Sequence, residues 1–188
     1  MTRAPTARES SDAAVIERSW REPECFADLF DRYYGQVHRF AARRLGGSLA
    51  DDVTAETFLV AFARRQQFDI SRPDARPWLF GIASNMVARH HRAEIRRYRM
   101  LSRAGLAEVS EGHADQVVAR LDAQALRGPL AAALAGISEA DRDVLLLVAW
   151  AELTSEEAGA ALGIPAGTAR SRLHRARKKI QAALAQAR

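Results

Sequence analysis

The stretch GTARSRLHRARKK, residues 167–179, places six cationic side chains between Arg170 and Lys179. On a helical wheel the apolar residues in and after this stretch fall on one narrow stripe, formed by Ala169, Leu173, Ala176, Ile180 and Leu184. The cations occupy most of the remaining surface, so the fold does not require them. Such a face is either solvated or set against a polyanion, and the neighbouring sequence must decide between the two.

A second helix is predicted directly before the cationic one. Thr154 and Glu157 match the capping-box pattern at the start of TSEEAGAALG, and Gly163 is placed to end that helix. We therefore expect a supporting helix over residues 155–162 and a second helix from residue 165 to about 184. Two helices joined by a short turn with glycine, the second with cations outside, are typical of the helix-turn-helix. In that motif the second helix enters the major groove of DNA.

The exposed face of the second helix supplies the predicted contacts to duplex DNA. Side chains near its N-terminus are expected to reach base edges, where arginine can bond guanine in a bidentate manner, and the later cations suit phosphates. We expect Arg175 to read a base and Lys179 to meet a phosphate. The full predicted set is Thr168, Arg170, Ser171, Arg172, His174, Arg175, Lys178 and Lys179.

Composition and charge agree with a polyanionic partner. The chain has 188 residues, of which 48% are hydrophobic, a net charge of +5 and a pI of about 10.1. These values allow one or two small cores, and they favour nucleic acid or an anionic membrane surface as partner. No apolar run approaches the roughly 18 residues of a spanning helix, and the N-terminus lacks the apolar centre of a signal peptide. We therefore expect a cytoplasmic protein without membrane insertion.

The single cysteine, Cys25, limits the chemistry that the chain can perform. It cannot form an internal disulfide, and it has no CxxC companion for a zinc site. We expect it to be a core residue, and we expect no metal and no cofactor.

Three helices are predicted in the first half of the chain. Apolar residues recur at spacings of three and four over residues 26–45, where Gly46 and Gly47 end the pattern. A second helix is expected from about Asp51, with acidic residues in its first turn. A third is expected to start near Pro77, a favourable first-turn residue, and to continue through residue 99.

Further helices are predicted in the second half of the chain, after residues 100–124, in which apolar residues show little periodicity. Residues 126–137 predict a short helix, and residues 138–150 predict another with Ser138 as its N-cap. Because no strand-length alternation occurs, the predicted fold is all-α, with two small helical domains joined by a flexible linker. The predicted boundaries are a disordered arm at 1–20, a first domain at 21–99, a linker at 100–124 and a helix-turn-helix domain at 125–188.

Two separate parts of the chain resemble one protein family. Residues 140–180, ADRDVLLLVAWAELTSEEAGAALGIPAGTARSRLHRARKKI, resemble region 4 of bacterial RNA polymerase sigma factors of the extracytoplasmic-function (ECF, group IV) subfamily of the sigma-70 family. LADDVTAETFLVAFARR, residues 49–65, resembles region 2.2, and PWLFGIASNMVARHHRAEIRR, residues 77–97, resembles regions 2.3 and 2.4. The chain departs from the usual pattern at Ala55, where glutamine is frequent, and at the small residues Ala158 and Gly159.

The resemblance implies a set of macromolecular partners. In the family, region 2.2 binds the clamp helices of the polymerase beta-prime subunit, and the matching positions here are Asp51, Asp52, Glu56 and Thr57. The plainer interpretation is that the acids only complement the helix dipole, which would explain Asp51 and Asp52 but not Glu56. Further implied partners are the polymerase beta flap, promoter DNA and an anti-sigma factor.

The third helix carries the residues that the resemblance assigns to the minus-ten promoter element. Asn85, Arg89, Arg92 and Arg96 are spaced by four, three and four residues, so they form one polar stripe opposite the apolar face. A basic stripe suits the phosphates of a separated strand. Phe68 is a candidate to stack on a flipped base, although an aromatic residue at a helix end is more often a packing residue.

The function implied is that of a dissociable promoter-specificity subunit that performs no covalent chemistry itself. One alternative is a free-standing helix-turn-helix regulator, against which the region 2-like segment argues. Another is a helical hydrolase that uses His90 and His91 with nearby acids. Adjacent residues on a helix diverge by about 100°, so these two histidines cannot easily share a metal ion.

Overall fold

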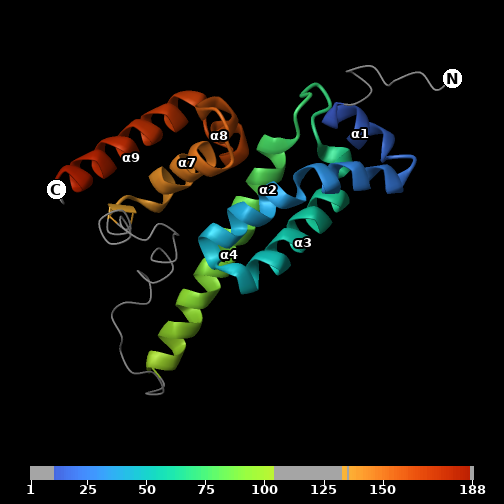
Figure 1. The fold of residues 1–188 in the computed structure, drawn as a ribbon. Helices are drawn as coiled ribbons and strands as arrows, with labels where there is room; N and C mark the ends of the chain where they lie inside the picture. The colour runs from blue at the N-terminus through green and yellow to red at the C-terminus, as the bar shows by residue number, and fades with distance from the viewer. Residues whose placement is uncertain (1–10, 104–132, 135, 187–188) are drawn as a thin grey trace.

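The computed structural model describes residues 11–103, 133–134 and 136–186, and all regular structure in these ranges is helical (Figure 1). The first half contains α1 (Asp12–Arg18), the 3-10 turn η1 (Pro23–Phe26), α2 (Ala27–Leu45), α3 (Gly47–Ala63), the 3-10 turn η2 (Arg65–Gln67) and α4 (Arg76–Arg103). The second half contains α7 (Glu139–Trp150), α8 (Ser155–Leu162) and α9 (Ala166–Gln186). The predicted all-α class is confirmed.

A packed helix occupies part of the predicted N-terminal arm. The side chain of Ser11 caps α1 by accepting a hydrogen bond from the Ala14 amide at 3.3 Å, and Val15 and Ile16 are buried. The prediction of a disordered arm was therefore wrong for residues 12–18, and residues 1–10 lie outside the described part. Within the described ranges, no helix has the length and apolar composition that crossing a bilayer requires.

Asp12, at the start of α1, ties three parts of the first half together. Its buried carboxylate accepts a hydrogen bond of 2.6 Å from the hydroxyl of Tyr33 and one of 2.8 Å from the backbone amide of Ala75, and it pairs with Arg32. Burial and the hydrogen bond to Asp12 raise the pKa of Tyr33. Each oxygen of the buried carboxylate therefore has a partner, as a charge removed from water requires.

Three long helices build the first half. α2 and α3 lie side by side and are joined at Gly46, whose φ of 81° lies in the region that favours glycine. α4 packs against both, and Phe40 of α2 meets Phe80 of α4 edge to face, with ring centroids 5.4 Å apart. The sequence predicts a start of α3 near Asp51, whereas the helix begins at Gly47, because its first turn also packs against the core.

The predicted capping residues begin α7 and α8 and end α8, whereas α9 covers residues 166–186 where 165 to about 184 was predicted. Ser138 caps α7 by accepting a hydrogen bond of 3.2 Å from the Asp141 amide. Thr154 and Glu157 form the capping box at the start of α8, with hydrogen bonds of 3.1 and 2.7 Å. Gly163 ends α8 in the left-handed conformation, with φ at 65°. These local predictions are confirmed.

Most of the predicted linker lies outside the described residues. Of residues 100–124 only 100–103 are described, and they form the end of α4. The short helix predicted over 126–137 is described only in part, with residues 133–134 helical. The predicted boundaries of the two domains therefore stay a prediction.

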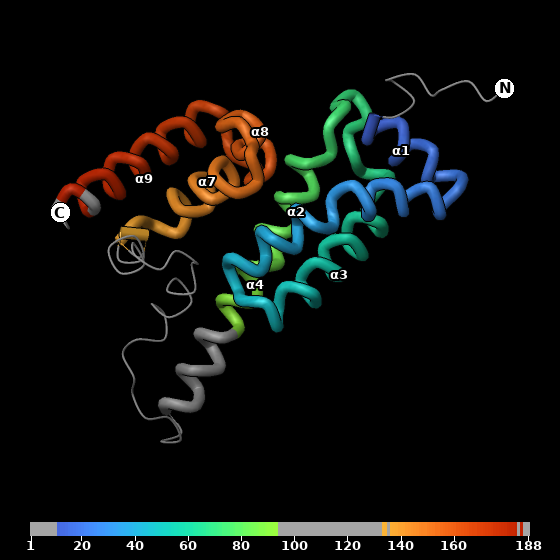
Figure 2. Tube along the Cα trace, in the orientation of Figure 1, coloured from blue at the N-terminus to red at the C-terminus, as the bar shows by residue number. Residues whose placement is uncertain are grey.

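The two halves of the chain pack against each other through α4 and α8 (Figure 2). Gly81 allows this approach, because a Cβ atom there would lie 2.5 Å from the carbonyl oxygen of Ala161. Arg44 of α2 and Asp143 of α7 also join the halves, through a mostly buried ion pair of 2.8 Å. Buried apolar side chains of both halves belong to one cluster. The helix-turn-helix is thus seated on the first half rather than separate from it.

Replacing Gly81 with alanine should destabilise the packing of α8 on α4. The new methyl group would press on a backbone carbonyl that cannot rotate away, and overpacking of this kind costs about 1–3 kcal/mol. Urea denaturation of the full chain measures the change. Gly47→Ala is the matched control, because a Cβ atom at Gly47 meets nothing within 4 Å. Equal unfolding free energies for the two variants would contradict this account of the contact.

Candidate nucleic-acid interface

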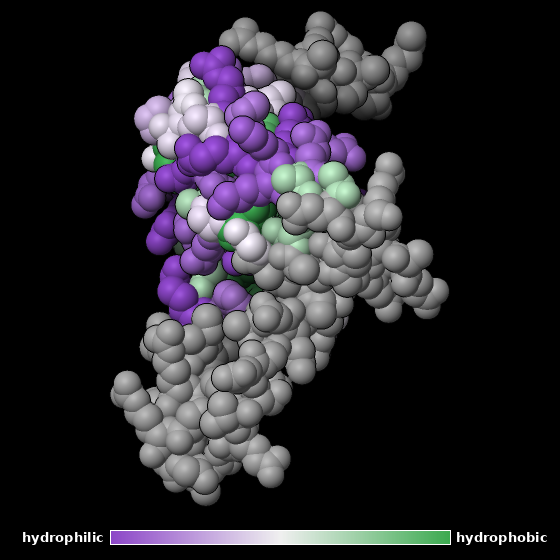
Figure 3. Space-filling view, turned by 90° about the vertical axis from the view of Figure 1, so that its left-hand side faces the viewer, coloured by the Kyte–Doolittle hydropathy of each residue, from purple (hydrophilic) through white to green (hydrophobic). Residues whose placement is uncertain are grey.

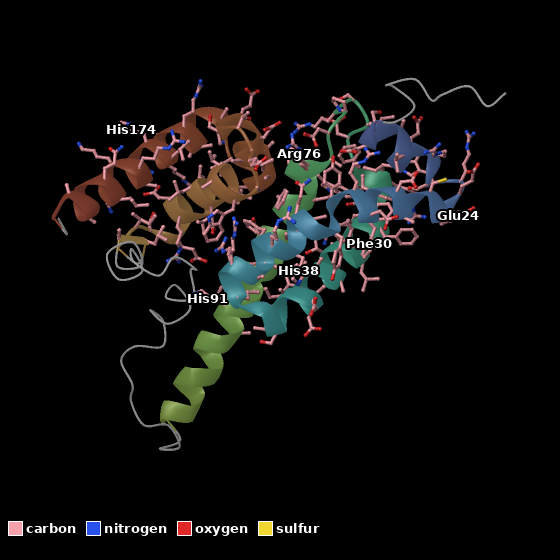
Figure 4. The ribbon with its side chains drawn as sticks, viewed as in Figure 1. Glu24, Phe30, His38, Arg76, His91 and His174 are labelled. Atoms are coloured by element: carbon pink, nitrogen blue, oxygen red, sulfur yellow. The ribbon has the colours of Figure 1, made fainter. Side chains whose placement is uncertain are left out.

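α9 has the predicted division between an apolar and a cationic face. Ala169, Leu173 and Ala176 are buried where α9 packs on α7 and α8. His174 is exposed and lies on the side of α9 that faces away from α7 (Figure 4). The described surface seen from the left-hand side of Figure 1 is predominantly hydrophilic (Figure 3). Among the cations of α9, Arg170, Arg177, Lys178 and Lys179 are exposed to solvent.

The eight predicted contacts in α9 differ in their exposure. Thr168 and Arg172 are half-buried, and the exposed ones are Arg170, Ser171, His174, Arg175, Lys178 and Lys179. The hydroxyl of Ser171 donates a hydrogen bond of 2.9 Å to the backbone carbonyl of Thr168, so part of its polar capacity is used within the helix. At 100° per residue, Ser171 and Lys178 lie opposite the buried stripe, and His174 and Arg175 lie on either side of them.

Arg175 is held by a carboxylate that sequence reasoning missed. Its Nη2 donates a hydrogen bond of 2.9 Å to Oδ1 of Asp141, and its Nε lies 3.4 Å from Oδ2 of the same residue. The hydrogen bond from Arg175 holds the pKa of the buried Asp141 carboxyl below its usual range. Asp141 lies in the acidic first turn of α7. An acidic residue at that place is already explained by the helix dipole, so the sequence alone does not indicate that Asp141 also pairs with an arginine.

The contribution of this ion pair to the free energy of unfolding should decrease at low pH. Because the pKa of Asp141 is lowered in the folded chain, the stabilisation is present above the ordinary aspartate pKa of about 3.9 and is lost as pH falls through the lowered value. Asp141→Asn should therefore be less stable than the parent at pH 7, and the difference should shrink toward pH 3. Urea denaturation across this pH range measures it, and a difference that does not change with pH would refute the pairing.

The predicted minus-ten stripe is only partly free in this structure. Asn85 and Arg92 of α4 are exposed, whereas Arg89 pairs with Glu56 of α3. The backbone of Arg96 belongs to α4, but its side chain lies outside the described part.

Glu56 therefore joins two predicted sites. Its carboxylate accepts a hydrogen bond from Arg89 and lies 3.8 Å from Nε2 of His90, and the Arg89 hydrogen bond lowers the pKa of Glu56. A predicted polymerase contact on α3 and a predicted DNA contact on α4 thus touch each other. Both side chains remain partly exposed, so the free energy of this pair is small.

The other predicted polymerase contacts divide into exposed and buried residues. Asp51 and Asp52 are exposed on α3, and Asp51 lies 3.1 Å from Nε2 of His38. Thr57 is fully buried, and its hydroxyl donates a hydrogen bond of 2.7 Å to the carbonyl of Val53. Thr57 is thus removed from the predicted surface, because it follows Glu56 by one residue and so turns about 100° toward the core.

Phe68 is a packing residue rather than an exposed platform. It is buried, and its ring packs against that of Trp78 with centroids 5.1 Å apart. The prediction that Phe68 stacks on a flipped base is contradicted, because Trp78 already covers the ring. In the part of the chain that the structure describes, no three His, Cys, Asp or Glu residues are grouped to hold a metal ion.

Comparison with known proteins agrees with both halves of the fold. The family model for sigma-70 region 2 matches residues 29–97, and the model for sigma-70 region 4 matches residues 127–180. The chain is 28% identical over 167 residues to the ECF RNA polymerase sigma factor SigW of Bacillus subtilis, covering 85% of this chain and 89% of SigW. It is 32% identical over 158 residues to the ECF RNA polymerase sigma factor SigL of Mycobacterium tuberculosis, covering 83% of this chain and 86% of SigL.

Two solved structures share the arrangement. CnrH, in complex with the cytosolic domain of CnrY, matches with a TM-score of 0.64 and 25% identity over 93% of this chain and 97% of CnrH. The sigma factor RpoE of Bartonella quintana, in complex with the anti-sigma factor NepR, matches with a TM-score of 0.61 and 24% identity over 87% of this chain and 98% of RpoE, which supports the fold. The chain belongs to the ECF group of the sigma-70 family.

Proposed function

We propose that this chain is a dissociable sigma subunit that joins core RNA polymerase and directs it to promoters. The observation that carries the proposal is a seated helix-turn-helix with an exposed cationic face, in one chain with a region 2 bundle. Sigma factors are transcription initiation factors, and we infer that this chain acts without covalent chemistry, in the cytoplasm where polymerase and promoter are. A free-standing regulator is not favoured, because it would have no use for the region 2 bundle.

The two promoter elements are assigned to different helices. We propose that α9 reads the minus-thirty-five element as duplex, with Ser171, His174, Arg175 and Lys178 toward the groove and Lys179 on phosphate. We propose that α4 contacts the opened minus-ten element through Asn85, Arg89 and Arg92. The exposure of these side chains supports the assignment.

The acidic side of α3 is assigned to the polymerase. We propose that Asp51 and Asp52 meet the clamp helices of the beta-prime subunit and that the helix-turn-helix half meets the beta flap. An anti-sigma factor is the proposed regulator, and the match to CnrH, whose structure is a complex with the cytosolic domain of CnrY, supports control by a protein partner.

Asp52→Lys should abolish binding to core polymerase while the chain stays folded. Asp52 is exposed and on the surface of α3, so reversing its charge repels a cationic partner without disturbing the core. Pull-down of purified core polymerase, with circular dichroism as the folding check, measures the effect. Glu24→Lys, a reversal at an exposed acid of η1, is the control. Equal recovery of core with the two variants would remove Asp52 from the interface.

Arg175→Ala and Lys179→Ala should fail differently on DNA, because only a base contact carries sequence information. Loss of Arg175 should weaken holoenzyme binding to the cognate duplex by roughly 1–3 kcal/mol and affect scrambled DNA far less. Loss of Lys179 should weaken both duplexes alike and lower the salt dependence by about one counterion. Binding across a salt series separates the two, and equal losses on both duplexes for Arg175→Ala would exclude it from base reading.

A further inference from the structure

The guanidinium of Arg175 on α9 is held along one edge by a carboxylate of the neighbouring helix α7. Its Nη2 donates a hydrogen bond of 2.9 Å to Oδ1 of Asp141, and its Nε lies 3.4 Å from Oδ2 of the same carboxylate. The side chain of Asp141 is 7% exposed, whereas that of Arg175 is 55% exposed. One edge of the guanidinium is therefore fixed to the protein, and more than half of the arginine side chain remains open to solvent.

The pairing leaves three N–H groups of Arg175 without an acceptor in the described part of the chain. A guanidinium carries five such groups, one on Nε and two on each terminal nitrogen. Asp141 engages the Nε group and one group of Nη2. The remaining groups include two parallel donors on a second edge, between Nη1 and Nη2. Guanine presents two acceptors, O6 and N7, side by side in the major groove, so this second edge matches guanine.

Asp141 is suited to hold this geometry because its own backbone is fixed. Its amide donates a hydrogen bond of 3.2 Å to the hydroxyl of Ser138, in the cap that begins α7, and α7 packs against α9. An arginine side chain ordinarily loses much conformational freedom when it binds a partner. Arg175 has lost part of that freedom before DNA arrives, and such preorganisation favours a contact that depends on direction.

The charge of the pair separates Arg175 from the other cations of α9. The carboxylate beside it offsets its positive charge, so Arg175 attracts a phosphate less strongly than an unpaired cation does. Its remaining donors keep their direction, and directional hydrogen bonds are the kind that distinguish one base from another. The attraction to phosphates, which does not depend on sequence, can come from the exposed cations Arg170, Arg177, Lys178 and Lys179.

We propose that Asp141 is a positioning residue for base reading, and that it holds Arg175 by one edge so that the second edge meets a guanine of the minus-thirty-five element. This inference rests on the proposed function. Asp141 is buried, so it acts through Arg175 and not by touching DNA. Its removal should therefore change which sequence is selected, rather than how strongly DNA of any sequence is bound.

The test selects bound duplexes from a library with a randomised minus-thirty-five segment, using holoenzyme formed from core polymerase and the full chain. The parent should enrich guanine, and Arg175→Ala should reduce that preference about tenfold at one position. Asp141→Asn should reduce it at the same position, because an amide presents one acceptor and one donor where the carboxylate presents two acceptors. Glu139→Gln is the matched control, because it removes an exposed acid from the same turn of α7 and should select as the parent does.

A second comparison separates positioning from a general structural role. In a chain that already carries Arg175→Ala, adding Asp141→Asn should change no further preference, because the residue through which Asp141 acts is gone. Preferences at the other positions of the segment should be retained in every variant, which shows that the helix-turn-helix is folded.

Each alternative outcome has a distinct meaning. If the parent holoenzyme selects no sequence, the proposed function fails and the inference fails with it. If the parent selects a sequence and Arg175→Ala loses no guanine, or Asp141→Asn keeps the guanine that Arg175→Ala loses, the positioning role is refuted while the proposed function stands. If Asp141→Asn weakens every position alike, or adds a loss to that of Arg175→Ala, Asp141 serves the fold and the proposal is overturned.

Discussion

The close approach of α4 and α8 at Gly81 is the constraint on which the arrangement of the two halves depends. Without a Cβ atom at this position, the backbone of α8 comes near enough to α4 for the apolar clusters of both halves to join. The positions of α7 and α9 relative to the first half are then set as well, because both helices pack on α8. Arg44 and Asp143 add a mostly buried ion pair of 2.8 Å between the halves, and such a pair contributes little net stability, because burying both charges costs about as much as their attraction returns.

Carboxylates also govern the cationic surfaces of the molecule. Asp141 holds Arg175 on α9, and Glu56 holds Arg89 on α4, so in each half an arginine predicted to bind DNA is paired within the chain. A guanidinium held in this way loses little further freedom when it meets a base or a phosphate, but the carboxylate competes for its donors. The free positive charge of α9 therefore lies with its other cations, of which Lys178 lies opposite the buried stripe.

Local signals in the sequence were sufficient for much of the fold. The caps at Ser138, Thr154 and Gly163 were predictable because each acts within a few residues, and the cationic face of α9 followed from its periodicity. Long-range contacts were not predictable. Nothing near Phe68 shows that Trp78 covers it, and nothing near Glu56 shows that Arg89 lies beside it. The burial of Thr57, in contrast, follows from the helical periodicity of α3, which the assignment of Thr57 to the polymerase surface by motif match ignored.

The buried carboxylate of Asp12 has a consequence for any shortened version of this protein. A chain that starts after residue 12 would lose the acceptor for the Tyr33 hydroxyl and for the Ala75 amide, the residue just before α4 begins. Two buried donors would then be left without a partner, at about 1–3 kcal/mol each. A boundary chosen where the family match begins, at residue 29, would thus remove a structural part of the first half while appearing to remove only a tail.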